Sequence, residues 1–156
     1  MDKDEFAAQV MKMRDTLYRV AASLLRSEAD REDAVSEAVA KAIVKLPGLR
    51  KADAFESWMI RILVNECYNP LRRGKREVVV DEVPDVYFAK EESRELFNAF
   101  HELEEKYRLP MVLHYVEGYK LDEIAGMLRL PEGTIKSRLM RGRRMLRALL
   151  DEEVSA

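Results

Sequence analysis

The sequence predicts an all-α protein, and three observations support that fold class. Glycine is scarce, with 6 in 156 residues, and the apolar–polar alternation of a half-buried strand is nearly absent outside residues 78–80. Apolar residues instead recur every three or four positions in both halves of the chain. A composition of 47% hydrophobic and 36% charged residues suits folded helices with well-solvated outer faces.

Three helices are expected in the first half. The first covers about residues 3–25, and its apolar stripe comprises Phe6, Val10, Met13, Leu17, Ala21 and Leu24. The second follows Ser27, a suitable N-cap, and runs to Leu46, where Pro47 and Gly48 end it. The third spans about residues 54–69, with inward-facing Phe55, Met59, Ile62 and Leu63. Pro70 has no backbone N–H, so this helix should end or kink at Asn69.

Residues 76–92 interrupt the helical pattern. They contain Pro84 and many acids and keep no sustained period, which predicts a flexible, solvated linker. A second helical region follows, with one helix marked by Leu96, Phe100 and Leu103 and another over residues 107–116. Pro110 suits that helix if it lies in the first turn. The expected organisation is a three-helix domain at 1–75, a linker at 76–92 and a four-helix domain at 93–151.

Residues 119–147 predict two short helices around a tight turn. Pro131 restarts the chain, and a helix from about Glu132 to Leu149 puts one set of residues on its apolar face: Ile135, Leu139, Gly142, Leu146 and Leu149. From Glu132 to Arg147 there are six cations and one acid, a net charge of +5. Such a helix fits a DNA major groove. A membrane-surface helix is the weaker alternative, since its apolar side has no Trp or Phe.

Charge is segregated along the chain, although the formal net charge is only −2. Residues 70–76 carry four cations and no acid, whereas residues 77–105 carry ten acids and two cations. This layout indicates separate surfaces for different partners. The single cysteine, Cys67, excludes an intrachain disulfide and fits a reducing compartment. With no apolar run near 18 residues and no signal-peptide core, we expect a cytoplasmic protein without membrane insertion.

Sequence motifs for chemistry are lacking. There is no nucleophile–base pair, no glycine-rich phosphate loop and no metal-ligand spacing, and His101 and His114 stand 13 residues apart. We therefore expect a protein that is not an enzyme and that uses no catalytic residue, cofactor or metal.

Two blocks of sequence resemble a known family. Residues 30–42 (DREDAVSEAVAKA) and 54–73 (AFESWMIRILVNECYNPLRR) resemble region 2 of the extracytoplasmic-function (ECF) sigma factors, and residues 103–150 resemble their region 4. The resemblance implies a bacterial transcription initiation factor. Its partners would be promoter DNA, core RNA polymerase (clamp helices through region 2, flap through region 4) and an anti-sigma factor.

The resemblance also implies residue roles. Polymerase-docking positions correspond to Asp33, Ser36 and Glu37. Positions that read and open the −10 element correspond to Trp58, Arg61, Asn65, Arg72 and Arg73. Positions that read the −35 element as duplex correspond to Thr134, Lys136, Ser137, Arg138, Arg141 and Arg144. Arginine and lysine pair with guanine edges or with phosphates, which suits both DNA surfaces.

Two departures from the family pattern affect the helix-turn-helix. Lys120 stands where Ser or Thr usually caps the first helix, so the capping box with Glu123 is expected to be lost. Arg129 stands where a turn glycine is usual, and a positive φ there would cost about 1 kcal/mol.

Two other functions compete with a sigma factor. A helix-turn-helix DNA-binding regulator would use only the second half of the chain. A helical protein that occupies polymerase without sigma activity would need no promoter selectivity.

Overall fold

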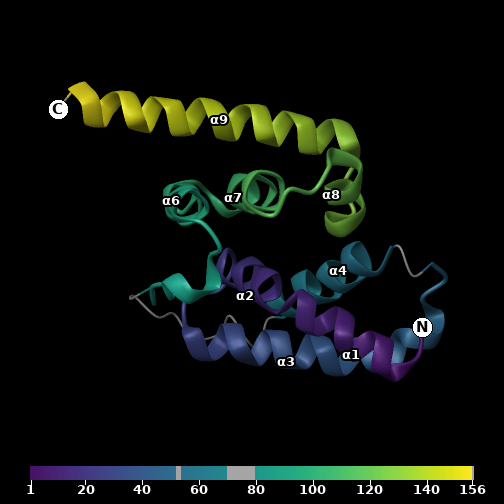
Figure 1. Ribbon diagram of the computed structural model, residues 1–156. Helices are drawn as coiled ribbons and strands as arrows, with labels where there is room; N and C mark the ends of the chain where they lie inside the picture. The colour runs from purple at the N-terminus through teal and green to yellow at the C-terminus, as the bar shows by residue number, and fades with distance from the viewer. Residues whose placement is uncertain (52–53, 70–79, 156) are drawn as a thin grey trace. The chain divides into compact units, whose positions relative to one another are not determined.

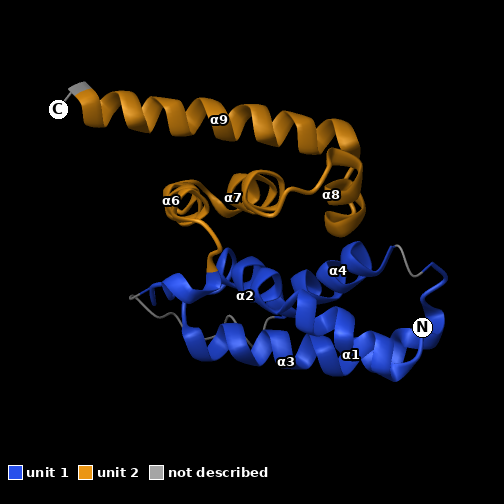
Figure 2. Cartoon of the chain, viewed as in Figure 1, with its two compact units in different colours: residues 1–87 blue, residues 88–156 orange. Residues whose placement is uncertain are grey.

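The computed structural model describes residues 1–51, 54–69 and 80–155, and the regular structure in these ranges is helical (Figure 1). The chain divides into two compact units, residues 1–87 and residues 88–156 (Figure 2). The all-α class with two helical bodies is thus confirmed.

Unit 1 contains four α-helices in its described part: α1 (Lys3–Lys12), α2 (Arg14–Ala22), α3 (Glu28–Lys45) and α4 (Phe55–Cys67). Two short 3-10 turns, η1 (Leu46–Gly48) and η3 (Asp85–Tyr87), complete it. Ser27 caps α3 as predicted, because its hydroxyl accepts the Asp30 N–H at 3.1 Å. Cys67 is fully buried and fills space at the end of α4.

The first predicted helix is not continuous. The chain leaves helical geometry at Met13, where φ is −95° and ψ is 2°, so the helix predicted over residues 3–25 is divided into α1 and α2, and α2 ends at Ala22. Met13 itself is buried. The stripe is buried except at Val10, which is half-buried: Phe6 of α1 meets Phe55 edge-on at 5.8 Å, and Leu17 of α2 is also buried. Packing thus overrides local helix propensity at this point.

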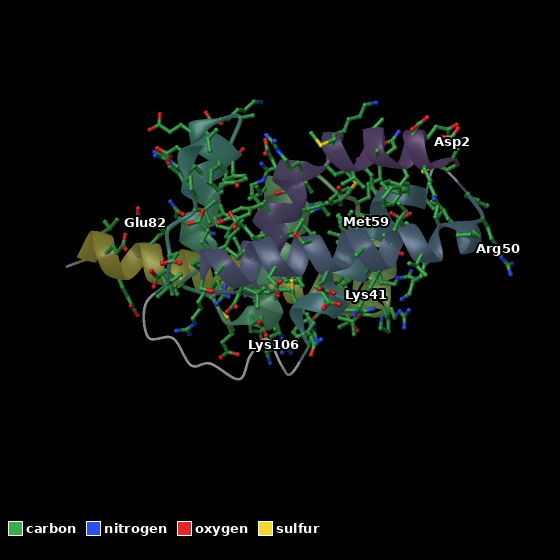
Figure 3. All side chains as sticks on the ribbon, turned by 90° about the horizontal axis from the view of Figure 1, so that it is seen from below. Asp2, Lys41, Arg50, Met59, Glu82 and Lys106 are labelled. Carbon is green, nitrogen blue, oxygen red and sulfur yellow. The ribbon has the colours of Figure 1, made fainter. Side chains whose placement is uncertain are left out.

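An alanine seam joins α3 to α4. Ala34, Ala38 and Ala42 lie four residues apart on α3 and are fully buried. Methyl side chains allow a close approach between helices. On α4, which packs against α3, Met59 (labelled in Figure 3) and Leu63 are both fully buried. The opposite side of α3 is therefore left for solvent or partners.

Residues 81–87, which we call the strap, pack on unit 1. The buried guanidinium of Arg31 donates from Nη2 to the Asp81 carbonyl at 2.8 Å and from Nε to the Leu25 carbonyl at 2.9 Å. The Asp81 N–H donates to the Arg26 carbonyl at 2.9 Å, and the Asp81 carboxylate accepts the Glu28 N–H at 2.9 Å. These bonds fasten the strap to the start of α3.

Aromatic stacking holds the other end of the strap. The Tyr87 ring lies 4.0 Å from the Tyr18 ring with 9° between the planes, and Arg19 donates to the Tyr87 carbonyl. Burial raises the pKa of the Tyr87 phenol, and the carboxylates of Glu32 and Glu28 add to that effect. This part of the expected linker 76–92 is therefore packed on unit 1 and not simply solvated.

The third predicted helix ends earlier than expected. α4 stops at Cys67, two residues before Asn69, whose N–H bonds to the Glu66 carbonyl at 3.1 Å. Pro70, Arg72 and Arg73 lie outside the described residues. Trp58, Arg61 and Asn65 are the described members of the predicted stripe.

Unit 2 contains four α-helices in its described part: α6 (Glu91–Phe100), α7 (Glu105–Met111), α8 (Leu121–Leu128) and α9 (Glu132–Ser155). A π-helical turn, η4 (Val112–Val116), extends α7. Pro110 is the sixth residue of α7 and so lies beyond the first turn. The widened turn follows it directly, which fits the loss of a regular helical hydrogen bond at proline.

In the helix-turn-helix, the expected loss of the capping box at Lys120 is wrong in part, and the expected positive φ at Arg129 is confirmed. The capping box of α8 is not lost altogether, because the Glu123 carboxylate still accepts the Lys120 backbone N–H at 2.9 Å. The reciprocal half is absent because a lysine side chain cannot accept a hydrogen bond. Arg129 does adopt the left-handed conformation, with φ 55° and ψ 45°. After the turn, α9 continues to Ser155, six residues beyond the predicted end.

Candidate nucleic-acid interface

The recognition helix α9 is anchored by its apolar face. Ile135 and Leu139 are buried, and Gly142 lies so close to α7 that an added Cβ would sit 3.0 Å from the Met111 sulfur. Leu146 and Leu149 are half-buried. Because α7 and α8 hold this face, the opposite face of α9 is fixed in direction.

That opposite face carries most of the residues assigned to the −35 element, and Arg138 lies on its flank. Lys136, Arg141 and Arg144 are exposed, whereas Thr134, Ser137 and Arg138 are half-buried. On the flank, the Arg143 guanidinium donates to the Tyr115 hydroxyl at 2.9 Å. The structure thus gathers all six predicted residues on the accessible part of one helix, the first three turns carrying most of them.

A shallow pocket of about 340 Å³ opens beside these residues. Its wall is formed by residues from the first turn of α7 and the first three turns of α9: Lys106, Tyr107, Gly133, Thr134, Ser137, Arg138 and Arg141. A hydrogen bond from the Arg141 guanidinium lowers the pKa of Tyr107, because a donor and a positive charge both favour the phenolate. The exposed Lys106 (labelled in Figure 3) places its ammonium nitrogen 5.0 Å from the centre of the Tyr107 ring.

Sequence reasoning missed Lys106 and Tyr107 as site residues. They precede the recognition helix by about 25 residues, and the sequence places Tyr107 only at the start of a predicted helix. Nothing in the local pattern distinguishes them, since neither residue belongs to a motif of its own helix. The packing of α7 against α9 is what brings them to the site.

The predicted −10 residues share one side of α4. Trp58 is half-exposed and rests on Phe55, with the ring centres 5.8 Å apart. Arg61 is half-exposed and Asn65 is exposed. Spacings of three and four residues align them on one helical face, so a flat aromatic surface lies in line with hydrogen-bonding groups.

The predicted polymerase-docking residues lie on the outer face of α3. Asp33, Ser36 and Glu37 are exposed and stand opposite the buried alanine seam. Near the other end of this helix, Lys41 pairs with Glu66 of α4 at 2.5 Å. Glu66 is only 4% exposed, so the pair neutralises a buried carboxylate and helps hold α3 and α4 together.

Among the described residues, no group of His, Cys, Asp or Glu side chains is arranged to hold a metal ion. In the same ranges, no helix combines the length and apolarity that crossing a membrane requires.

A helix-turn-helix with a cationic recognition helix defines unit 2 as a DNA-binding fold. Comparison with known families extends this to both units. Residues 10–77 match Sigma-70 region 2, and residues 93–146 match Sigma-70, region 4.

Individual relatives of the chain are sigma factors as well. RNA polymerase sigma factor SigV of Bacillus subtilis is 29% identical over 145 residues, which cover 90% of this chain and 87% of SigV. ECF RNA polymerase sigma factor SigM of Mycobacterium tuberculosis is 33% identical over 140 residues, covering 86% of this chain and 71% of SigM.

Two solved structures have the same fold. The sigma factor RpoE of Bartonella quintana, solved with the anti-sigma factor NepR, gives a TM-score of 0.77 at 25% identity and covers 94% of this chain and 97% of RpoE. CnrH, solved with the cytosolic domain of CnrY, gives 0.72 at 25% identity and covers 97% of this chain and 90% of CnrH.

The chain belongs to the ECF group of the sigma-70 family. It is an alternative sigma factor, which directs promoter-specific transcription initiation. Membership of this family excludes the two competing functions, a stand-alone DNA-binding regulator and a polymerase-binding protein without sigma activity. The relatives are transcription initiation factors and not enzymes.

Proposed function

We propose that three surfaces divide the work of this sigma factor. The outer face of α3 docks on core polymerase, the exposed side of α4 holds the opened −10 element, and the cationic face of α9 reads the −35 element. The observation that carries this proposal is the gathering of all six −35 residues on the accessible face of α9, whose apolar face is anchored on α7 and α8. The protein would act in the cytoplasm and perform no covalent chemistry itself.

On the polymerase surface, Asp33 and Glu37 are one helical turn apart. Two exposed carboxylates on one face favour a basic partner such as the clamp helices, and Ser36 adds a hydrogen-bonding group between them. A rim charge acts mainly on the association rate and its salt dependence. Unit 2 would make a second contact, with the flap.

For the −10 element, a half-exposed Trp58 offers a face on which an unstacked base can rest. Base stacking on an aromatic side chain contributes about 1–3 kcal/mol, which offsets the few kcal/mol needed to flip a base. Arg61 and Asn65 would hold the strand beside it. Arg72 and Arg73 keep their assignment from the sequence as phosphate contacts.

For the −35 element, Lys136, Arg138 and Arg141 would supply donors to guanine edges or phosphates. Thr134 and Ser137 can bond either base type, and Arg144 lies further along the helix toward backbone phosphates. An anti-sigma factor is a further proposed partner. The structural neighbours RpoE and CnrH were solved with NepR and CnrY respectively.

The test is reconstitution with bacterial core RNA polymerase, followed by mapping of transcript 5′ ends on fragmented genomic DNA. We expect starts downstream of one shared pair of −35 and −10 motifs. Glu37→Lys should weaken core binding, whereas Glu5→Lys, the same change at an exposed position of α1, should not. Binding to core without defined starts would contradict promoter reading.

The −10 role has a separate test. Trp58→Ala should reduce transcription from a duplex promoter and recover most of it on a template that is already open over the −10 element. A structural role for Trp58 predicts an equal loss on both templates. Arg138→Ala, by contrast, should lose −35 selectivity on both.

A further inference from the structure

The charged side chains that line the pocket beside the recognition helix are all positive. Three cations line it, Lys106, Arg138 and Arg141, together with the hydroxyls of Thr134 and Ser137. No carboxylate is among its lining residues. Convergent cations and hydroxyl donors are the chemistry that binds a phosphate group.

Tyr107 organises this pocket from α7. The side chain is only 5% exposed, the Lys106 ammonium nitrogen lies 5.0 Å from the centre of its ring, and Arg141 lines the same pocket. The two cations come from different helices, Arg141 from α9 and Lys106 from α7, and both lower the pKa of the Tyr107 phenol, Arg141 the more strongly. The buried ring therefore lies between the parts of α7 and α9 that supply the positive charges of the pocket.

We propose that this pocket binds one backbone phosphate of promoter DNA next to the −35 element, with Lys106 as a direct phosphate contact and Tyr107 as the residue that positions Lys106 and Arg141. The inference rests on the proposed −35 role of α9. It adds a contact from outside the helix-turn-helix. A contact made from α7 as well as from α9 would fix the angle at which the recognition helix enters the groove.

Duplex DNA fits the pocket better than a free phosphate ion for two reasons. The pocket is shallow and open, so a phosphate can enter while still attached to its two sugars. Its α9 wall is built from residues on the same accessible face that would read base edges, so one duplex can satisfy both.

The experiment uses holoenzyme reconstituted from the full chain and core polymerase. The probe is a promoter fragment found by the transcript mapping above, carrying a single neutral methylphosphonate at each position of the −35 region in turn. Affinity is measured by competition over a range of salt concentrations. The variants are Lys106→Gln and Tyr107→Phe, and the control is Lys90→Gln, which neutralises an exposed cation of unit 2 outside the pocket.

Lys106→Gln should lower the slope of log Kobs against log salt concentration by about 0.9, the value for one lost phosphate contact. One methylphosphonate position should weaken the wild type but leave Lys106→Gln unaffected. In Tyr107→Phe, the methylphosphonate at that position should reduce affinity less than it does in the wild type. An unchanged circular dichroism spectrum would show that the variant is folded. Lys90→Gln should behave as the wild type.

If Lys106→Gln keeps the wild-type slope and phosphate pattern while Arg138→Ala loses promoter binding, the pocket proposal is overturned and the −35 role stands. If wild-type holoenzyme shows no promoter selectivity, the proposed function itself fails. If inorganic phosphate at constant ionic strength shifts the NMR signals of Lys106 and Tyr107 while no methylphosphonate position matters, the pocket binds a small anion instead, which also overturns the proposal.

Discussion

Arg31 and Asp81 are 50 residues apart in sequence, yet the Arg31 guanidinium donates a hydrogen bond of 2.8 Å to the Asp81 carbonyl. Arg31 is fully buried, and its guanidinium also donates to the Leu25 carbonyl and the Tyr18 hydroxyl. The strap thus supplies an acceptor to a charge on α3 that the rest of unit 1 satisfies only in part. Residues 81–87 lie outside both matched sigma regions, so their packing is a feature of this fold beyond those regions.

Replacing Arg31 with methionine should destabilise unit 1 by about 1–3 kcal/mol, because the buried Leu25 carbonyl and the Asp81 carbonyl lose a charged donor. Trp58 is the single tryptophan of the chain, so its fluorescence in urea follows unit 1 alone. Arg26→Met is the matched control, since the Arg26 side chain is exposed and only its carbonyl contacts the strap. Equal urea midpoints for the two variants would contradict this role of Arg31.

Tyr87 should make unit 1 less stable at alkaline pH. Its folded pKa is raised above the ordinary value of 10.0, so the unfolded chain ionises first. The stability contribution is complete below pH 10 and is lost as pH rises through the folded pKa. Thermal unfolding of the wild type and Tyr87→Phe, compared between pH 8 and pH 11, checks this. The phenylalanine variant should lose less stability over the alkaline part of that range.

Arg129→Gly should stabilise unit 2 by about 1 kcal/mol, since only glycine adopts a left-handed conformation without a steric cost. Arg129 has φ 55° in the turn between α8 and α9. Arg129→Ala keeps the Cβ and serves as the control, and it should bring no such gain. The measurement is the unfolding transition seen by circular dichroism but not by Trp58 fluorescence.

Gly142→Leu should destabilise unit 2 by about 1–3 kcal/mol through overpacking. Even a Cβ at this position would lie 3.0 Å from the sulfur of Met111, which is itself buried. Arg144→Leu, two residues on and exposed, is the control for added apolar bulk on α9. A wild-type melting temperature for Gly142→Leu would show that Met111 can move aside.

Candidate functional residues could be predicted where one element carries the whole pattern. Most of the six residues assigned to the −35 element lie on the side of α9 away from its apolar face, with Arg138 on the flank, and the period of that helix alone predicts this. The same holds for Asp33, Ser36 and Glu37, because the alanine seam fixes which face of α3 is turned inward. Residues drawn from separate elements, such as Lys106 and Tyr107, have no shared local period that could reveal them.

Helical periodicity in the sequence determined the all-α class, the position of the helix-turn-helix and the outward faces of α3, α4 and α9, because burial of an apolar stripe orients each helix. Tertiary packing alone decided the break at Met13, where Phe6 must reach Phe55. It also decided the docking of the strap through Arg31 and Tyr18, and the meeting of Tyr107 with Arg141. Each of these depends on contacts between residues distant in the chain, and the free energy of such contacts outweighs local preference without leaving a local pattern.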